Sequence, residues 1–176
     1  CRLGEKIASA TSISAGSTVT PELANELGMS AVPESTWEIL MRNQPQGVFE
    51  SDLPGWLESW RFLNGTRPFD ENAARRYTRA LYNGDPRNAQ MATNHIHAMS
   101  TVPESLVSAL GTPARPFLVI HGTEDPLVPL DHGEATARLV RGSKLVRLPG
   151  AGHMFFNEES WQEIGRALIA HTGGSA

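Results

Sequence analysis

The stretch that decides the fold of this 176-residue chain is Phe117-Leu118-Val119-Ile120-His121-Gly122-Thr123-Glu124-Asp125-Pro126-Leu127-Val128-Pro129. Four apolar residues followed by a turn-forming segment predict a buried strand that runs into a loop. The loop carries an acid, Asp125, and is stiffened by Pro126 and Pro129. A carboxylate held still at a strand end is suited to orienting an imidazole. An ordinary turn aspartate is the alternative interpretation of Asp125, and Glu124 is a competing acid whose side chain we expect to point elsewhere.

A second segment, Pro149-Gly150-Ala151-Gly152-His153-Met154, follows the predicted strand 144–148. Its small residues allow a tight chain path and let His153 project over the strand ends. The interval from Asp125 to His153 has room for one helix and one strand. Both loops are therefore expected to leave the same edge of a parallel sheet. We predict that Asp125 and His153 act together as a catalytic acid and base.

The rest of the chain divides into a long helical region and flanking strands. Strands are predicted at 6–13, 117–121 and 144–148, helices at 131–141 and 157–171, and short helices, several opened by proline, from 20 to about 110. Asp131 and Glu134 are typical of a capping box, and Asn157 of a helix cap. Trp161, Ile164 and Leu168 should share one face of the last helix. The pattern predicts an α/β protein whose three strands leave an open sheet edge, so we expect further strands elsewhere.

Composition excludes several classes of protein. The chain is 40% hydrophobic and 19% charged, with a net charge of −4, and it has no apolar run long enough for a membrane span. It lacks the basic stripe typical of nucleic-acid binding. Its one cysteine, Cys1, permits no internal disulfide. No leader sequence is visible, and we expect a cytoplasmic protein that binds neither nucleic acid nor membrane.

The remaining histidines do not predict a metal site. His95 and His97 lie on a predicted helix and point about 200° apart, so they are expected to line or support a pocket rather than to share a metal. His121 should pack beside the site at the end of its strand. His132 and His171 are expected to be solvated helix residues. No metal and no cofactor are predicted.

The nucleophile is missing from this pattern. Ser12-Ile13-Ser14-Ala15-Gly16 resembles the G-x-S-x-G elbow in its spacing, with Ser14 at the nucleophile position. However, Ser17-Thr18-Val19 separate it from the next predicted helix, whereas an elbow turns directly from strand into helix. We therefore predict that Ser14 is not the nucleophile.

Large apolar side chains are frequent in the helical region, which suits a pocket for a hydrophobic molecule. The candidates for substrate binding are Trp56, Trp60, Phe62 and Met99, from a wider supply that includes Trp37, Phe49 and Met91. The alternative is that most of them form the core of the helical region.

The order of strand, helical insertion, acid loop and histidine loop resembles the C-terminal portion of the α/β-hydrolase fold. The resemblance assigns residues 1–16 to a core strand, 17–112 to a helical cap, and 113–176 to the last core strands and helices. Trp60-Arg61-Phe62-Leu63-Asn64-Gly65-Thr66, Pro68-Phe69-Asp70, Asp125-Pro126 and the Gly-rich histidine segment look like the aclacinomycin methylesterase group. Members also carry an N-terminal part with the serine elbow, which has no counterpart here.

The resemblance implies a serine carboxylesterase that acts on a bulky apolar ester through a Ser-Asp-His triad, without a cofactor. Asp125 would orient the imidazole of His153, and His153 would act as the general base. The serine would come from a missing N-terminal half of the same hydrolase. The chain alone is then expected to be inactive. Alternatives within the fold are an amidase like proline iminopeptidase and a cofactor-free haloperoxidase. A non-catalytic binding or partner module is an alternative outside enzymes.

Overall fold

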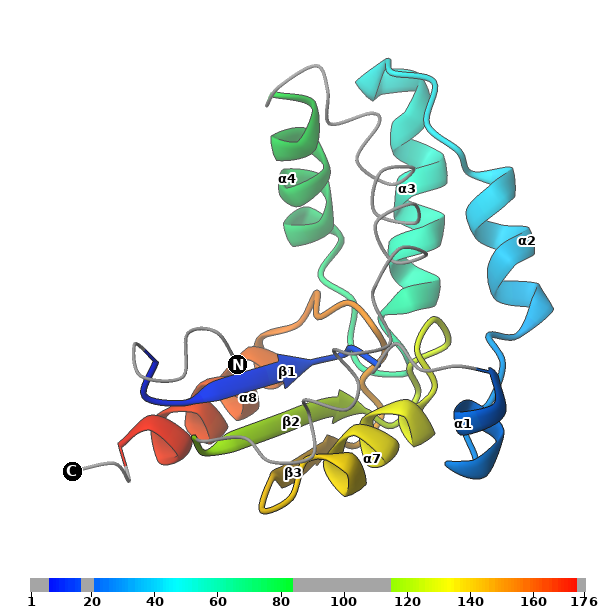
Figure 1. Ribbon diagram of the computed structural model, residues 1–176. Helices are drawn as coiled ribbons and strands as arrows, with labels where there is room; N and C mark the ends of the chain where they lie inside the picture. The colour runs from blue at the N-terminus through cyan, green and yellow to red at the C-terminus, as the bar shows by residue number, and fades with distance from the viewer. Residues whose placement is uncertain (1–6, 17–20, 84–114, 174–176) are drawn as a thin grey trace.

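The computed structural model describes residues 7–16, 21–83 and 115–173. Three strands form one layer and the helices α2, α3 and α4 stand together at one side of it (Figure 1). The elements in chain order are β1 (Ala10–Ile13), α1 (Pro21–Glu26), α2 (Glu34–Arg42), α3 (Phe49–Leu63), α4 (Glu71–Tyr82), β2 (Phe117–Gly122), α7 (Leu130–Leu139), β3 (Lys144–Leu148) and α8 (Glu158–Thr172).

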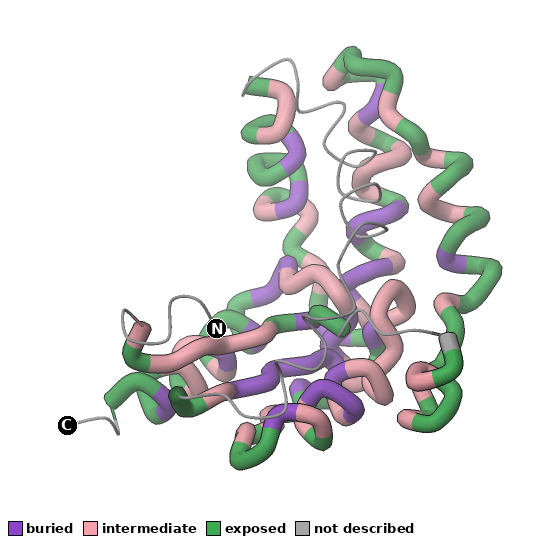
Figure 2. Tube along the Cα trace, viewed as in Figure 1, coloured by how far each residue is buried: buried purple, intermediate pink, exposed green. Residues whose placement is uncertain are grey.

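The sheet is parallel, with the order β1-β2-β3, so β2 lies in the middle. Ile13 is paired with Ile120, and Gly122 with Leu148. Residues 118–122 of β2 are all buried, which Figure 2 shows as a continuous buried stretch. A parallel strand that is covered on both faces needs such a run, and this is why four successive apolar residues predicted it.

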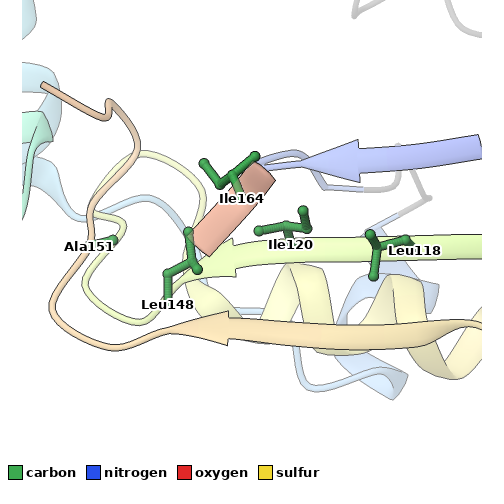
Figure 3. Close-up of a cluster of buried hydrophobic side chains, with 5 residues drawn as sticks. All are labelled: Leu118, Ile120, Leu148, Ala151 and Ile164. Carbon is green, nitrogen blue, oxygen red and sulfur yellow. The ribbon is translucent and has the colours of Figure 1, made fainter. Parts of the chain in front are cut away.

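Helices α7 and α8 cover opposite faces of the sheet. Ile120 packs with Ile164 of α8 in a buried cluster that also contains Leu118, Leu148 and Ala151 (Figure 3). The next residue, His121, faces Gly133 of α7. Successive side chains of a strand point to opposite faces, so one strand contacts both helices. The ends of β2 and β3 are thereby fixed from both sides.

A second buried cluster joins the inserted helices to the core. Trp60 and Leu63 of α3 pack with Ala74 of α4 and with Phe156, which comes from the segment before α8. Asp70 caps α4 by accepting a hydrogen bond from the backbone N–H of Ala73 at 2.9 Å. Helices α1 to α4 lie between β1 and β2 in the chain, while the predicted boundary at 112/113 falls outside the described residues and stays a prediction.

Several predicted boundaries and roles differ from the structure. β1 begins at Ala10 rather than residue 6, because its partner β2 begins at Phe117, opposite Ala10. β3 and the cap at Asn157, which accepts from the N–H of Ser160 at 2.8 Å, are as predicted. Trp161 is 59% exposed and does not share the buried face of Ile164.

The capping box predicted at Asp131 is wrong. The chain enters α7 through Pro129 as cap residue, and Asp131 already lies in the first helical turn. Its Oδ2 instead accepts hydrogen bonds from the backbone and side chain of Ser30. The contact joins α7 to the segment that precedes α2, so a residue expected to act locally acts over a long sequence separation.

The outer edge of β1 pairs with no strand among the described residues. Ile13, at the end of that edge strand, is 36% exposed. A sheet edge presents unpaired backbone groups that natural proteins cover.

No helix within the described ranges is both long and apolar enough to cross a bilayer.

Candidate active site

Asp125 is held at the end of β2 by its own loop. Its Oδ1 accepts hydrogen bonds from the backbone N–H groups of Leu127 at 2.9 Å and Val128 at 2.7 Å. Its side chain is fully buried. This short-range turn is one that aspartate side chains commonly form. It directs the other carboxylate oxygen, Oδ2, towards the loop after β3.

His153 meets that oxygen. Its Nδ1 lies 2.9 Å from Oδ2 of Asp125. A carboxylate can only accept, so Nδ1 carries the hydrogen and Nε2 is left as the basic nitrogen. The imidazole is 23% exposed, and Nε2 makes no hydrogen bond to any described residue. The pair therefore has a buried acid behind an accessible base, which is the arrangement needed to take a proton from a hydroxyl group.

A third polar side chain, that of His121, lies close to Asp125. His121 is completely buried, and its Nε2 donates to the backbone oxygen of Val128 at 2.8 Å while lying 3.6 Å from Oδ2 of Asp125. Its Nδ1 has no hydrogen-bond partner. The prediction that His121 packs beside the site agrees with this position.

Glu124 does not contact His153. Its Oε2 accepts a hydrogen bond from the backbone N–H of Thr66 at 3.0 Å, in the turn between α3 and α4. Its own N–H donates to the oxygen of Ala151 at 2.9 Å. Of the two adjacent acids, Asp125 is the one whose side chain reaches the imidazole.

Ser14 follows β1 in an unusual conformation. Its φ of 46° lies in the left-handed region, which costs a residue other than glycine energy, and it is 7% exposed. Its hydroxyl is buried without a hydrogen-bond partner. No hydrogen bond joins Ser14 to His153, both of which the structure describes. The prediction that Ser14 is not the nucleophile stays a prediction.

The described candidate substrate residues pack within the helices inserted between β1 and β2. Trp56 stacks on Trp60 with ring centroids 4.7 Å apart, and the indole N–H of Trp60 donates to Thr78 at 2.8 Å. Trp60 is 8% exposed, whereas Trp56 and Phe62 are partly buried against the same cluster. Met99 lies outside the described residues, as do Met91, His95 and His97. A substrate role for these side chains stays a prediction, and Trp60 is packed against both Trp56 and Phe156.

Trp56 also belongs to a polar network at the start of α3. Its indole N–H donates to the hydroxyl of Tyr82, which in turn donates to Asp52. Burial by itself raises the pKa of Asp52, but hydrogen bonds from Tyr82 and from the backbone N–H groups of residues 46–48 outweigh it and leave that pKa below its ordinary value. The pKa of Tyr82 is raised by burial and by the neighbouring carboxylate.

Two histidines expected in solvent are instead engaged with the protein. His171 is 6% exposed, and its Nε2 lies 3.1 Å from the backbone oxygen of Ala10. His132 is partly buried, and its Nε2 lies 2.8 Å from the backbone oxygen of Ser30. Both partners are more than 100 positions away in the chain, which is why helical position alone misplaced these residues.

The contacts of Asn64 and Arg67 were not predicted from the sequence, in which Asn64 was noted only within the segment that resembles the methylesterase group. Both residues lie in the turn after α3 and bind the loop that carries His153. The available signal was the Asn64-Gly65 dipeptide, which predicts a turn but not what the turn contacts. Among the described residues, no group of three or more His, Cys, Asp or Glu side chains could hold a metal ion.

The chain belongs to the α/β-hydrolase fold family, whose sequence model matches residues 4–160. It is 29% identical over 135 residues to rhodomycin D methylesterase DauP of Streptomyces sp. (strain C5), a match that covers 76% of this chain and 44% of that protein. The chain thus spans less than half the length of this relative. The predicted fold and the resemblance to methylesterases are confirmed.

Solved structures show the same fold. The 2-hydroxy-6-oxo-6-phenylhexa-2,4-dienoate hydrolase of Rhodococcus sp. strain RHA1 matches with a TM-score of 0.64 and 21% identity, over 97% of this chain and 57% of that one. A bromoperoxidase of Bacillus anthracis matches with a TM-score of 0.63 and 21% identity, over 94% and 58%. A hydrolase and a bromoperoxidase share this architecture, so the fold by itself does not select between their activities.

Proposed function

We propose that this chain supplies the acid and the base of a serine carboxylesterase that acts on a bulky apolar ester. The observation that carries the proposal is the 2.9 Å contact between Nδ1 of His153 and Oδ2 of Asp125. The buried carboxylate fixes the tautomer, and Nε2 is left to accept a proton. The serine would be contributed by polypeptide beyond these 176 residues, in the same hydrolase.

In the proposed reaction the serine oxygen bonds to the ester carbonyl carbon while its proton passes to Nε2 of His153. The bond to the alcohol oxygen then breaks, and the alcohol leaves with that proton. Water attacks the resulting acyl-enzyme, again giving a proton to Nε2. The acid departs and the serine regains its hydrogen. Asp125 stays an acceptor throughout and stabilises the imidazolium.

The proposed substrate class rests on the relative and on the cap. The matched curated protein is named a rhodomycin D methylesterase. The described part of the cap places Trp56 and Phe62, both partly buried, beside a cluster of aromatic residues. Partly exposed aromatic surface favours large apolar groups. We therefore expect bulky aromatic methyl esters to be hydrolysed faster than short-chain water-soluble esters, and the reverse order would contradict this preference.

Two observations support the proposal that a further polypeptide belongs to this protein: the open edge of β1, and the share of the relative's length that this chain matches. β1 has no strand beside its outer edge among the described residues, and the matched protein is longer than this chain. We infer that the N-terminal half of the same hydrolase pairs there and brings the serine. A stable, monomeric 176-residue chain that hydrolyses esters alone would contradict this inference.

The test combines the 176-residue chain with a polypeptide that supplies the missing half, using methyl 2-naphthoate as a probe. Asp125→Asn and His153→Ala should each lower kcat by about 10⁴-fold or more. Two controls, Glu134→Gln and His132→Ala, neutralise an acid and truncate a histidine outside the site and should retain activity. If either test variant keeps the full rate, that residue has no role in the reaction. Halogenation without ester hydrolysis would favour a haloperoxidase instead.

A further inference from the structure

The turn that follows α3 is hydrogen-bonded along the loop that carries His153. We call residues 63–67 the cap turn and residues 149–156 the histidine loop. The backbone N–H groups of Thr66 and Arg67 donate to the oxygen of Gly150 at 3.0 and 3.2 Å. Gly65 and Ala151 form an antiparallel bridge. The two segments therefore run side by side, although they are far apart in the chain.

His153 is bracketed by two of these bonds. The N–H of Gly152 donates to the oxygen of Asn64 at 3.0 Å, and the N–H of Met154 donates to the oxygen of Leu63 at 2.9 Å. The residues before and after the imidazole are thus both fixed by the cap turn. Asp125 holds the imidazole at Nδ1, and the cap turn holds the backbone on both sides of His153.

Side chains reinforce the contact. Asn64 is completely buried; its Oδ1 accepts from the N–H of Phe156 at 3.0 Å and its Nδ2 donates to the oxygen of Arg67 at 2.9 Å. The guanidinium of Arg67, 6% exposed, donates to the oxygen of Pro149 at 2.8 Å, to Ser160 at 2.9 Å and to Glu163 at 3.0 Å. Buried polar groups that are satisfied in this way define one arrangement, because any shift leaves several of them unpaired.

The same turn is continuous with the aromatic part of the cap. Helix α3 carries Trp56 and Trp60 and ends at Leu63, whose backbone oxygen binds Met154. Figure 1 shows the lower ends of α3 and α4 meeting the loop before α8. A displacement of α3 would move the oxygens of Leu63 and Asn64 together, and with them the backbone of His153.

We propose that the cap turn positions the general base: residues 63–67 hold His153 in line with Asp125, so the alignment of the base depends on the cap. The inference rests on the proposed function for its catalytic meaning. Asn64 and Arg67 are positioning residues in this account, because they reach the reaction only through His153. Loss of the contact should lower kcat with little change in KM, since none of residues 63–67 is a proposed substrate-binding residue.

Gly65→Ala is the direct test. Gly65 has a φ of +76°, and a methyl group there would lie 2.5 Å from the oxygen of Gly150 and 2.7 Å from the nitrogen of Gly152. Gly142→Ala is the matched control: its φ is +80°, and a methyl group there meets no atom within 4 Å. Both variants carry the same left-handed strain, and only the first forces the two segments apart.

The first readout needs no turnover. In the 176-residue chain, the proton NMR signal of the His153 Nδ1–H, assigned by its loss in His153→Ala, reports the hydrogen bond to Asp125. Gly65→Ala should abolish this signal or speed its exchange with water by about tenfold or more, and Gly142→Ala should leave it unchanged. An unchanged signal in folded Gly65→Ala would overturn the proposal.

Asn64→Asp provides a second test if Gly65→Ala does not fold. It keeps the acceptor for Phe156 and removes the donor to Arg67, and Asn43→Asp is its control in the cap, away from the histidine loop. The His153 Nδ1–H signal should weaken in Asn64→Asp and stay unchanged in Asn43→Asp. Equal signals in the two variants would contradict the proposal.

In the reconstituted esterase with methyl 2-naphthoate, Gly65→Ala should lower kcat about 10- to 100-fold and leave KM within about twofold. A rise in KM with kcat unchanged would contradict positioning. Absence of hydrolysis by the unaltered protein would contradict the proposed function alone, because the N–H signal does not depend on it.

Discussion

The buried imidazole of His121 lies close to Asp125, with its Nε2 3.6 Å from Oδ2 of the carboxylate and 2.8 Å from the backbone oxygen of Val128. The same Val128 gives its N–H to Oδ1 of Asp125. The loop after β2 is thus held on both sides, by an acid that accepts from it and by an imidazole that donates to it. This small network keeps the carboxylate in place.

His121→Leu should therefore destabilise the chain by about 1–3 kcal/mol, because the oxygen of Val128 loses its donor in a partly buried place. His121→Gln should cost less, since its amide N–H reaches a position close to that of Nε2. Urea unfolding of both variants measures the difference in free energy of unfolding. Equal losses would mean that volume, and not the hydrogen bond, decides the effect.

The packing of α7 on His121 predicts opposite effects for two helical glycines. A methyl group on Gly133 would lie 2.5 Å from Nδ1 of His121, whereas one on Gly165 of α8 would meet no atom within 4 Å. Gly165→Ala should stabilise the chain by about 0.5–1 kcal/mol, since alanine is the better helix former. Gly133→Ala should destabilise the chain, because the clash with His121 outweighs the same gain in helix propensity. Thermal unfolding checks both, and stabilisation by Gly133→Ala would show that His121 can move aside.

From the contacts of the Asp52 carboxylate we predict that the contribution of α3 and α4 to stability depends on pH in the acid range. Its pKa is lowered in the folded chain, where burial opposes the shift and the hydrogen bonds from Tyr82 and the backbone prevail. A lowered pKa means that the stabilisation is present above the unfolded pKa, about 3.9, and is lost as the pH falls through the lower, folded value.

Asp52→Asn should accordingly cost about 1–2 kcal/mol at pH 7 and less near pH 3, as measured by urea unfolding at both pH values. Asp70→Asn, which keeps a side-chain acceptor at the cap of α4, serves as the control. A cost that does not shrink on acidification would show that the charge of Asp52 is unimportant.

Replacing the strained Ser14 after β1 should stabilise the chain without loss of activity. Ser14→Gly should stabilise the chain by about 1 kcal/mol, because glycine adopts the left-handed backbone at little cost and the variant removes a buried hydroxyl without a partner. The reconstituted esterase should keep its rate in Ser14→Ala and Ser14→Gly. Complete loss of hydrolysis in both variants would identify Ser14 as the nucleophile and remove the need for a serine from another polypeptide.

The pair of Asp125 and His153 could be predicted because its signals are local. Each follows an apolar strand, and the prolines and glycines around them define the loops. The end of β3 at Leu148 and the cap at Asn157 were predicted for the same reason. The burial of His171 could not be predicted from the sequence, because its partner Ala10 lies 161 positions earlier. Solvent exposure of a helical residue depends on what packs against the helix, and local periodicity does not contain that information.

By itself, the amino-acid sequence determined the alternation of strands and helices and the order in which acid and histidine appear. Hydrophobic runs and turn residues act over a few positions, so they are readable without coordinates. Tertiary structure alone decided that Asp131 binds Ser30, that His121 supports Asp125, and that Asn64 lies against Phe156, 92 positions away. Such contacts form only when the sheet has brought distant loops to one edge, because hydrogen bonds require atoms about 3 Å apart.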